Sequence, residues 1–229
     1  GHYSFSLFWQ KFTSRAIWDI NCLGGELSCG VAWNSLWMAV LVGATSTLLG
    51  LAFALLVTRT GIQAKAFIRV SSLLPIITPP FVIGLALILL FGRSGALNGF
   101  LEWAFGIPPT RWIYGLPGIW LAQTLAFTPI AFLVLIGVVE GVSPSMEEAS
   151  QTLRASHWQT FWTVSLPLMR PGIANAFLLG FIESLADFGN PLVLGGSYEV
   201  LSTQIFFAIA GAQADQSMAA VLALSLIHI

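Results

Sequence analysis

The chain has 229 residues and a formal net charge of −1; hydrophobic side chains make up 56% of it and charged ones only 8%. An average soluble domain carries about 25% charged residues, and the near-neutral charge gives no electrostatic reason to expect a nucleic-acid partner. No Asp, Glu, Lys or Arg occurs in 31–58, 70–92 or 112–139, and each run exceeds the roughly 20 residues that a spanning helix needs. The sequence therefore predicts an all-α polytopic membrane protein. A soluble protein with buried helices is the alternative, but it would have to bury all three runs.

Residues 1–30 mix aromatic and charged side chains and are expected to form an extracytoplasmic or interfacial segment. They contain the two cysteines of the chain, Cys22 and Cys29, which have no His or second Cys pair near them and so form no metal set. A disulfide and two free thiols both remain open.

The first span is expected at 34–57, where small side chains suit close helix packing in lipid. These small residues are Gly43, Ala44, Ser46, Gly50 and Ala54. The span is followed by three cations within 59–69, namely Arg59, Lys65 and Arg69. Such a cluster favours the cytoplasmic side.

The second apolar run, 70–91, contains Pro75, Pro79 and Pro80. Proline removes a backbone donor and clashes with the preceding turn, so this span is expected to be broken, with Thr78 capping a second half that restarts at Pro79. Because a break inside a membrane requires protein or water to satisfy the freed backbone groups, Pro79 and Pro80 are candidate pathway residues. A packing kink is the alternative.

The rest of the chain is expected to hold an outer loop, a third span, an inner segment, a shorter span, a turn, an apolar helix and a final span. Their ranges are 92–116, 117–139, 141–170, 172–188, 188–196, 200–211 and 216 to the end. About five spans result, the last one truncated. The terminal LSLIHI (224–229) resembles a translated sequencing adapter and is expected to be a scar; a genuine helix containing His228 is the alternative.

Glu183 and Asp187 are four residues apart and are expected on one face of the shorter span. An ionisable group inside a span is costly and marks a candidate pathway. Asn190, which is expected to shape the following turn, joins this candidate set. Pairing with a basic group elsewhere, or protonation, is an equally open use of the two acids.

The inner segment interrupts the apolar pattern with the sequence MEEASQTLRASHWQTFWTVSLPL (146–168). Ser145 with Glu148, and Ser156 with Gln159, have capping-box spacing, which predicts two short helices joined by a turn. His157 is expected to begin the second helix, and Pro167 and Pro171 to end it. The polar face is expected to meet water or a partner, and its acids fit a protein better than an anionic lipid surface. That face consists of Glu147, Gln151 and Arg154.

The pattern E-A-S-x-x-x-R, nine residues, then V-x-L-P (Glu148 to Pro167) resembles the EAA loop of ABC importer permeases, E-A-A-x-x-x-G, nine residues, I-x-L-P. The resemblance implies a type I ABC importer-like helical bundle in which this loop is a cytoplasmic coupling element that docks on an ATPase subunit. Ser150 replaces the second Ala, and Arg154 replaces a Gly that would allow a left-handed turn. Arg154 leaves open whether the common turn geometry is kept. The coupling residues implied are Glu147, Glu148, Ala149, Ser150, Arg154, Ala155, Ser156 and Pro167.

The stretches 74–95, 153–168 and 183–196 are similar to the first half of the fused permeases of the ferric-iron importer group. This implies a fragment of a bacterial inner-membrane permease with ferric iron as substrate. Its partners would be a cytoplasmic ATPase subunit, a periplasmic substrate-binding protein and a second permease half. Permeases for polyamine, thiamine, sulfate or aminoethylphosphonate share much of the pattern and are the alternatives.

No G-x-x-x-x-G-K-[ST] loop occurs, so the chain is not expected to be an enzyme, and no cofactor or metal site is expected. A function from another class is an ion-coupled secondary transporter, with the broken span and the two acids as its ion site. That function would leave the inner segment without a role.

Overall fold

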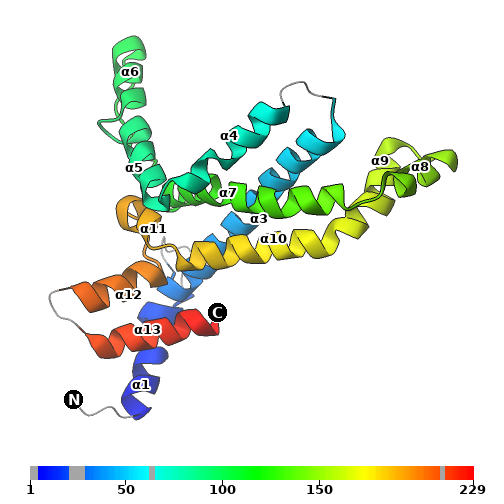
Figure 1. The fold of residues 1–229 in the computed structure, drawn as a ribbon. Helices are drawn as coiled ribbons and strands as arrows, with labels where there is room; N and C mark the ends of the chain where they lie inside the picture. The colour runs from blue at the N-terminus through cyan, green and yellow to red at the C-terminus, as the bar shows by residue number, and fades with distance from the viewer. Residues whose placement is uncertain (1–4, 21–28, 62–64, 212–214) are drawn as a thin grey trace. The chain divides into compact units, whose positions relative to one another are not determined.

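The computed structural model describes residues 5–20, 29–61, 65–211 and 215–229, and within these ranges every regular element is a helix. Figure 1 shows their course. In chain order they are α1 (Phe5–Phe12), α2 (Arg15–Trp18), α3 (Val31–Arg59), α4 (Lys65–Ile77), α5 (Pro80–Phe91), α6 (Ala96–Phe105), α7 (Leu116–Glu140), α8 (Pro144–Thr152), α9 (His157–Thr160), the π-helical turn η2 (Phe161–Ser165), α10 (Leu166–Ala186), α11 (Gly189–Leu194), α12 (Leu201–Ala210) and α13 (Gln216–His228).

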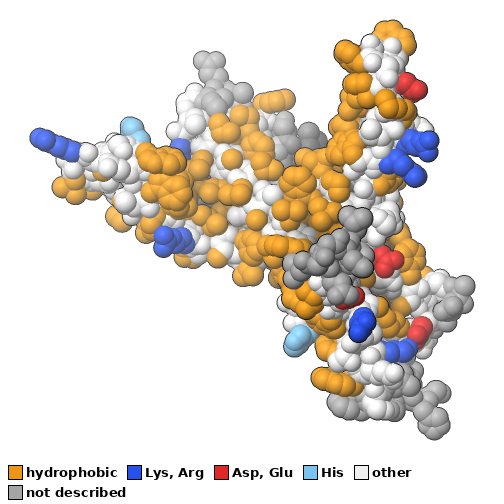
Figure 2. All heavy atoms as spheres, turned by 180° about the vertical axis from the view of Figure 1, so that it is seen from behind, with side chains coloured by type: hydrophobic (Ala, Val, Ile, Leu, Met, Phe, Trp, Pro, Cys, Tyr) orange, Lys and Arg blue, Asp and Glu red, His pale blue; other side chains and the backbone are white. Residues whose placement is uncertain are grey.

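Four helical stretches of the described chain are long and apolar enough to cross a membrane, which confirms the predicted class. They are Val31–Arg59, Phe81–Phe105, Leu116–Glu140 and His157–Ala186. The fifth expected span corresponds to α13, which at 13 residues is shorter than these. Apolar side chains cover much of the face seen in Figure 2, as expected for surfaces that meet lipid.

The break expected in the second span is confirmed, because α4 ends at Ile77 and α5 begins at Pro80. The bounds 70–91 are not, because the stretch long enough to cross a membrane runs from Phe81 to Phe105, into the expected outer loop. The predicted capping role of Thr78 is wrong: its hydroxyl donates to the carbonyl of Pro75 at 2.9 Å and closes the first half. Pro79 is the N-cap of α5 and makes no side-chain cap hydrogen bond. The fixed φ of Pro80 suits the first helical turn, where its missing N–H costs nothing.

Three segments are more helical than expected. The outer loop 92–116 contains α6, which ends at Gly106 in a left-handed conformation (φ 66°). The predicted turn at 188–196 contains the short helix α11. Pro167 and Pro171 do not end a helix, because the chain is helical from His157 to Ala186. Pro167 is the second residue of α10, just after the π-helical turn in which the hydrogen-bond register changes.

The described chain divides into two compact units, of which one comprises residues 42–78 and 124–181. Its core lies among α3, α7 and α10 and contains Ala54, Val57, Ala131, Phe132, Leu135, Val139, Val142, Met169 and Ala176. Small residues permit the close approach: a Cβ placed on Gly50 would lie 2.8 Å from the Cβ of Ala131, and one on Gly172 would collide with Val138. The packing role predicted for Gly50 is therefore confirmed.

The other unit comprises residues 1–41, 79–123 and 182–229. Its apolar cluster joins the start of α3 to α12 and α13 through Ile17, Val31, Ala32, Leu201, Val221 and Leu222. Two buried polar side chains reinforce this junction. Ser35 accepts from the Leu201 amide at 2.8 Å, and Asn34 donates to the Glu199 carbonyl at 3.0 Å.

The cysteines fall at the edge of the described chain. Cys29 is disulfide-bonded, and Cys22 lies outside the described residues, within 21–28.

Candidate functional site

The inner segment folds as the predicted pair of short helices, α8 and α9, with η2 extending the second. The capping box expected from Ser145 and Glu148 is wrong, because α8 begins at Pro144 with Ser143 as its N-cap. The hydroxyls of Ser143 and Ser145 instead bond each other at 2.8 Å. Pro144 at the first helical position explains the earlier start, since proline is pre-organised for that position.

The turn between the two helices keeps the geometry that glycine would give it. Arg154 has φ 66° and is the non-glycine residue with positive φ in the described chain. The Arg154 amide bonds the Gln151 carbonyl at 2.9 Å and the Ala155 amide bonds the Ser150 carbonyl at 3.2 Å. This pair of bonds is a Schellman motif, with Arg154 in the position that glycine usually occupies. An L-residue with a side chain pays about 1–2 kcal/mol for this conformation.

The second helix begins as predicted. The Ser156 hydroxyl accepts from the Gln159 amide at 3.2 Å, and the Gln159 side chain accepts from the Ser156 amide at 2.8 Å, so the capping box is complete. His157 is the first helical residue, as expected. Two bonds tie the helices to each other: Ser150 to Thr160 between hydroxyls at 3.0 Å, and Gln151 Nε2 to His157 Nδ1 at 3.3 Å.

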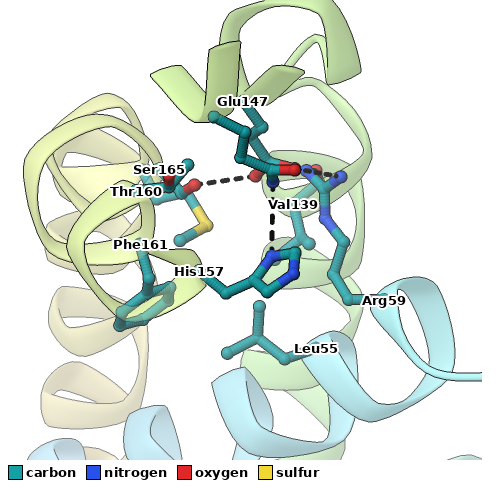
Figure 3. A pocket seen from close by; sticks show the side chains of 10 residues that line it. Leu55, Arg59, Val139, Glu147, His157, Thr160, Phe161 and Ser165 are labelled. Carbon is teal, nitrogen blue, oxygen red and sulfur yellow. Dashed lines mark hydrogen bonds and ion pairs between the residues drawn. The ribbon is translucent and has the colours of Figure 1, made fainter. Parts of the chain in front are cut away.

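One side of this helix pair faces the interior of its unit, over a cavity of about 380 Å³ (Figure 3). Glu147 lies on this side. Its Oε2 accepts from Arg59 Nη1 at 2.9 Å, and its Oε1 accepts from the Ser165 hydroxyl at 2.7 Å. The prediction that Glu147 faces water or a partner is therefore wrong, because its carboxylate is bonded to Arg59 and Ser165. Gln151 also lines this pocket but is exposed, so its predicted contact with water or a partner stays a prediction.

The other side is exposed and holds Glu148, Ala149, Arg154 and Ser156. Neither Glu148 nor Arg154 makes an ion pair with another described residue. Apolar side chains stand beside them, with Leu153 at 84% and Trp158 at 69% exposure. The ring of Trp158 contacts those of Phe161 and Trp162, with centroids 6.2 and 5.5 Å away. This exposed mixture of an acid, a base and large apolar groups has the composition of a protein-docking surface.

The remaining predicted coupling residues are less exposed. Ser150, Ala155 and Pro167 are half-buried. Ser150 and Ala155 belong to the Schellman turn, and Pro167 lies in the first turn of α10. They shape the segment rather than form its surface.

The predicted pathway acids occupy different surroundings. Glu183 is exposed on α10, whereas Asp187 is half-buried one residue beyond the end of that helix. The Asp187 carboxylate accepts four hydrogen bonds: from Gln123 Nε2 at 2.9 Å, Asn190 Nδ2 at 2.8 Å, the Gly189 amide at 2.9 Å and the Asn190 amide at 3.3 Å. We call the group formed by Asp187, Gln123, Asn190 and Ser184 the polar knot. It fixes the turn from α10 into α11.

Asn190 is fully buried in this knot, and its Oδ1 has no hydrogen-bond partner among the described residues. A Cβ on Gly84 of α5 would lie 2.9 Å from that oxygen. The α5 backbone thus approaches the knot closely. The predicted role of Asn190 in shaping this turn agrees with its bonds to Asp187.

Sequence reasoning missed four residues of these clusters: Arg59, Ser165, Gln123 and Ser184. Arg59 was interpreted only as part of a cytoplasmic charge cluster, and 88 positions separate it from Glu147. Gln123 had a visible signal, since it is an amide side chain within the uncharged run 112–139 and a buried amide needs partners. Among the described residues no group of three or more His, Cys, Asp or Glu is arranged to hold a metal ion.

Comparison with known proteins places these features in a family. The family model described as "Binding-protein-dependent transport system inner membrane component" matches residues 34–229. The ferric transport system permease protein FbpB of Actinobacillus pleuropneumoniae is 48% identical over 217 residues, which cover 95% of this chain and 32% of the relative. The chain thus spans about a third of the length of this relative.

Two further comparisons agree. The sulfate transport system permease protein CysW of a Synechocystis species is 32% identical, over 84% of this chain and 68% of the relative. The crystal structure of a bacterial alginate ABC transporter in complex with an alginate-bound periplasmic protein has a TM-score of 0.70 at 18% identity, over 99% of this chain and 81% of that chain. The fold is therefore that of an ABC importer permease. The chain belongs to the family of binding-protein-dependent transport system inner membrane components.

Proposed function

We propose that this chain is part of the permease of an ATP-driven importer of ferric iron. A separate cytoplasmic ATPase subunit would dock on the helix pair α8–α9 and supply the energy. A periplasmic binding protein would deliver the cargo, and a second permease half, fused or separate, would complete the pathway.

The observation that carries this proposal is the division of the helix pair into two sides. Glu148, the acid of the EAA pattern, is exposed without an ion-pair partner among the described residues, next to Leu153 and Trp158. Glu147, its neighbour, is held inside the chain by Arg59. The helix pair thus has one side exposed to a partner and another side bonded to the spans. This arrangement suits a coupling element.

Transport by alternating access requires partners that bind two states of the permease with different affinity. Closure of ATP-bound ATPase subunits on the paired coupling elements would favour the outward-facing state. A loaded binding protein on the outer side would favour the same state. Hydrolysis would then return the permease to the inward-facing state.

Ferric iron is supported by the 48% identity to a ferric transport permease over almost the whole chain. Sulfate is the competing cargo, since a sulfate permease is 32% identical over 84% of the chain. The higher identity and coverage favour iron. The polar knot and Glu183 would contribute polar groups near the pathway, with Pro79 and Pro80 marking the break in the neighbouring span.

The test is reconstitution of the full-length permease, its ATPase and its binding protein in liposomes, with uptake of radioactive ferric iron or sulfate measured with and without ATP. We expect ATP-dependent uptake of iron and none of sulfate. A Glu148→Arg variant should retain membrane insertion but lose uptake. ATP-dependent uptake of sulfate would show that sulfate, not ferric iron, is the substrate. Uptake driven by an ion gradient without ATP would instead support a secondary transporter.

A further inference from the structure

The helix pair α8–α9 is connected to the spans through one polar cluster, formed by Arg59, Glu147 and Ser165, which we call the clasp (Figure 3). Arg59 is the last residue of α3, Glu147 lies in α8, and Ser165 ends η2 just before α10. Three side chains thus bring together three elements that are distant in sequence.

Arg59 also reaches a fourth element. Its Nη2 donates to the carbonyls of Val139 at 3.3 Å and Val142 at 3.2 Å, at and just beyond the end of α7. The last carbonyls of a helix have no partner within the helix and carry partial negative charge. One guanidinium therefore holds the ends of α3 and α7 and the carboxylate of α8 in a fixed arrangement.

Glu147 connects the same point to α10. Its second oxygen accepts from the buried hydroxyl of Ser165 at 2.7 Å. Both carboxylate oxygens are thus used, one toward α3 and α7, the other toward α10. A displacement of α8 would therefore strain the hydrogen bonds that connect Glu147 to α3 and to Ser165 before α10, and through Arg59 to the end of α7.

The clasp differs from an ordinary surface ion pair. The side chains of Arg59 and Glu147 are 30% and 20% exposed, whereas those of Arg69 and Glu140, which pair at 3.2 Å in the same unit, are 50% and 55% exposed. Arg69 and Glu140 join α4 to α7. Partial burial and extra hydrogen bonds strengthen charged contacts, so the clasp is the stiffer of the two.

We propose that the clasp is the joint through which movement of the docked helix pair passes to α3, α7 and α10. Arg59 and Glu147 are then positioning residues: they act on the pathway through the helices they hold and do not touch the ATPase. This inference rests on the proposed docking of an ATPase and adds to it the route by which docking is transmitted.

The experiment uses the full-length permease with its ATPase in nanodiscs and needs no knowledge of the cargo. Hydrogen–deuterium exchange is measured without nucleotide and after trapping with ATP and vanadate. The wild type is expected to show nucleotide-dependent changes in α8 and also in peptides covering the ends of α3 and α7. Co-purification of the ATPase reports docking separately.

In Arg59→Gln and Glu147→Gln, we expect the ATPase to co-purify and the change in α8 to persist. The nucleotide-dependent change in α3 and α7 should fall by about fivefold or more, the lower end of typical coupling energies. Arg59→Lys keeps the charge and should recover part of the response. The matched controls Arg69→Gln and Glu140→Gln should behave as the wild type.

Wild-type responses of α3 and α7 in both clasp variants would overturn the inference while leaving the docking proposal intact. Loss of ATPase binding in both Arg59→Gln and Arg59→Lys would overturn it too, because the clasp would then shape the docking surface rather than transmit its movement. If the wild type itself failed to bind an ATPase, the proposed function would fall.

Discussion

Two polar clusters hold helix junctions in this chain, and they do so by different means. The clasp joins a cation to an anion at the ends of spans and remains partly open to water. The polar knot places one carboxylate among neutral donors, with Gln123 and Asn190 fully buried. The buried amide groups of Gln123 and Asn190 need an acceptor, which the half-buried Asp187 carboxylate supplies.

The largest expected effect comes from breaking the polar knot. Asp187→Ala would remove the acceptor for four donors, leaving buried amide groups unpaired, and is expected to lower the free energy of unfolding by about 3–5 kcal/mol. Chemical denaturation of the full-length permease in detergent would measure this. The matched control is Glu183→Gln, an exposed carboxylate on the same helix, with an expected effect within about 0.5 kcal/mol. Equal effects of the two substitutions would contradict the account of the knot.

Breaking the clasp should cost less. Without nucleotide or ATPase, Arg59→Gln is expected to destabilise the helix pair by about 1–2 kcal/mol, between the values for surface and buried ion pairs. Hydrogen exchange of peptides within 144–165 would report it. Arg69→Gln should leave those peptides unchanged. Greater destabilisation than that of Asp187→Ala would reverse the order that burial predicts.

The turn beside the clasp carries strain that can be released. Glycine tolerates the φ of 66° at this position, so Arg154→Gly should stabilise the helix pair by about 1 kcal/mol. Arg154→Val should destabilise it, since a β-branched side chain fits this region poorly. Exchange rates of the α8 amides would distinguish the two directions. A stabilising valine would show that the turn is not left-handed.

The smallest expected effect on stability comes from the exposed ion pair between Lys11 and Asp215, whose Nζ and Oδ2 atoms are 2.8 Å apart. The hydrogen bond from Lys11, with help from the Met218 amide, lowers the pKa of Asp215. The associated stability is present above the unfolded-state pKa, about 3.9, and is lost as pH falls through the lower folded-state value. Denaturation midpoints measured below pH 4 should show a small decline that Lys11→Gln reduces. A loss of stability as pH rises above neutrality would contradict this assignment.

The sequence predicted much of the fold because its signals are local. Uncharged runs located the spans, prolines located the break before Pro80, and Ser156 with Gln159 identified the start of α9. The motif placed Glu148 on the docking side, which is still a prediction about a partner. Arg154 stands where the family pattern has a glycine, so the sequence did not decide whether the turn is left-handed. The structure shows that it is, with Arg154 at positive φ and both Schellman hydrogen bonds formed.

What the sequence could not give is pairing over long separations. Arg59 meets Glu147, and Gln123 meets Asp187 at a separation of 64 positions. No periodicity within one helix encodes such contacts. Glu147 and Glu148 are adjacent and identical in type, but a helix rotates by about 100° per residue, so one faces the cavity and the other the exterior. Which of the two acids faces the cavity depends on where α3 and α7 lie, and the local sequence does not encode that.

The most direct test of the central claim, that this helix pair is the docking surface for an ATPase, is site-specific photocrosslinking in membranes that contain the whole transporter. A photoreactive amino acid in place of Leu153, exposed beside Glu148, should crosslink to the ATPase subunit. The same group in place of Trp103, in the segment expected outside, should not. Crosslinks from position 103 and none from position 153 would contradict the account.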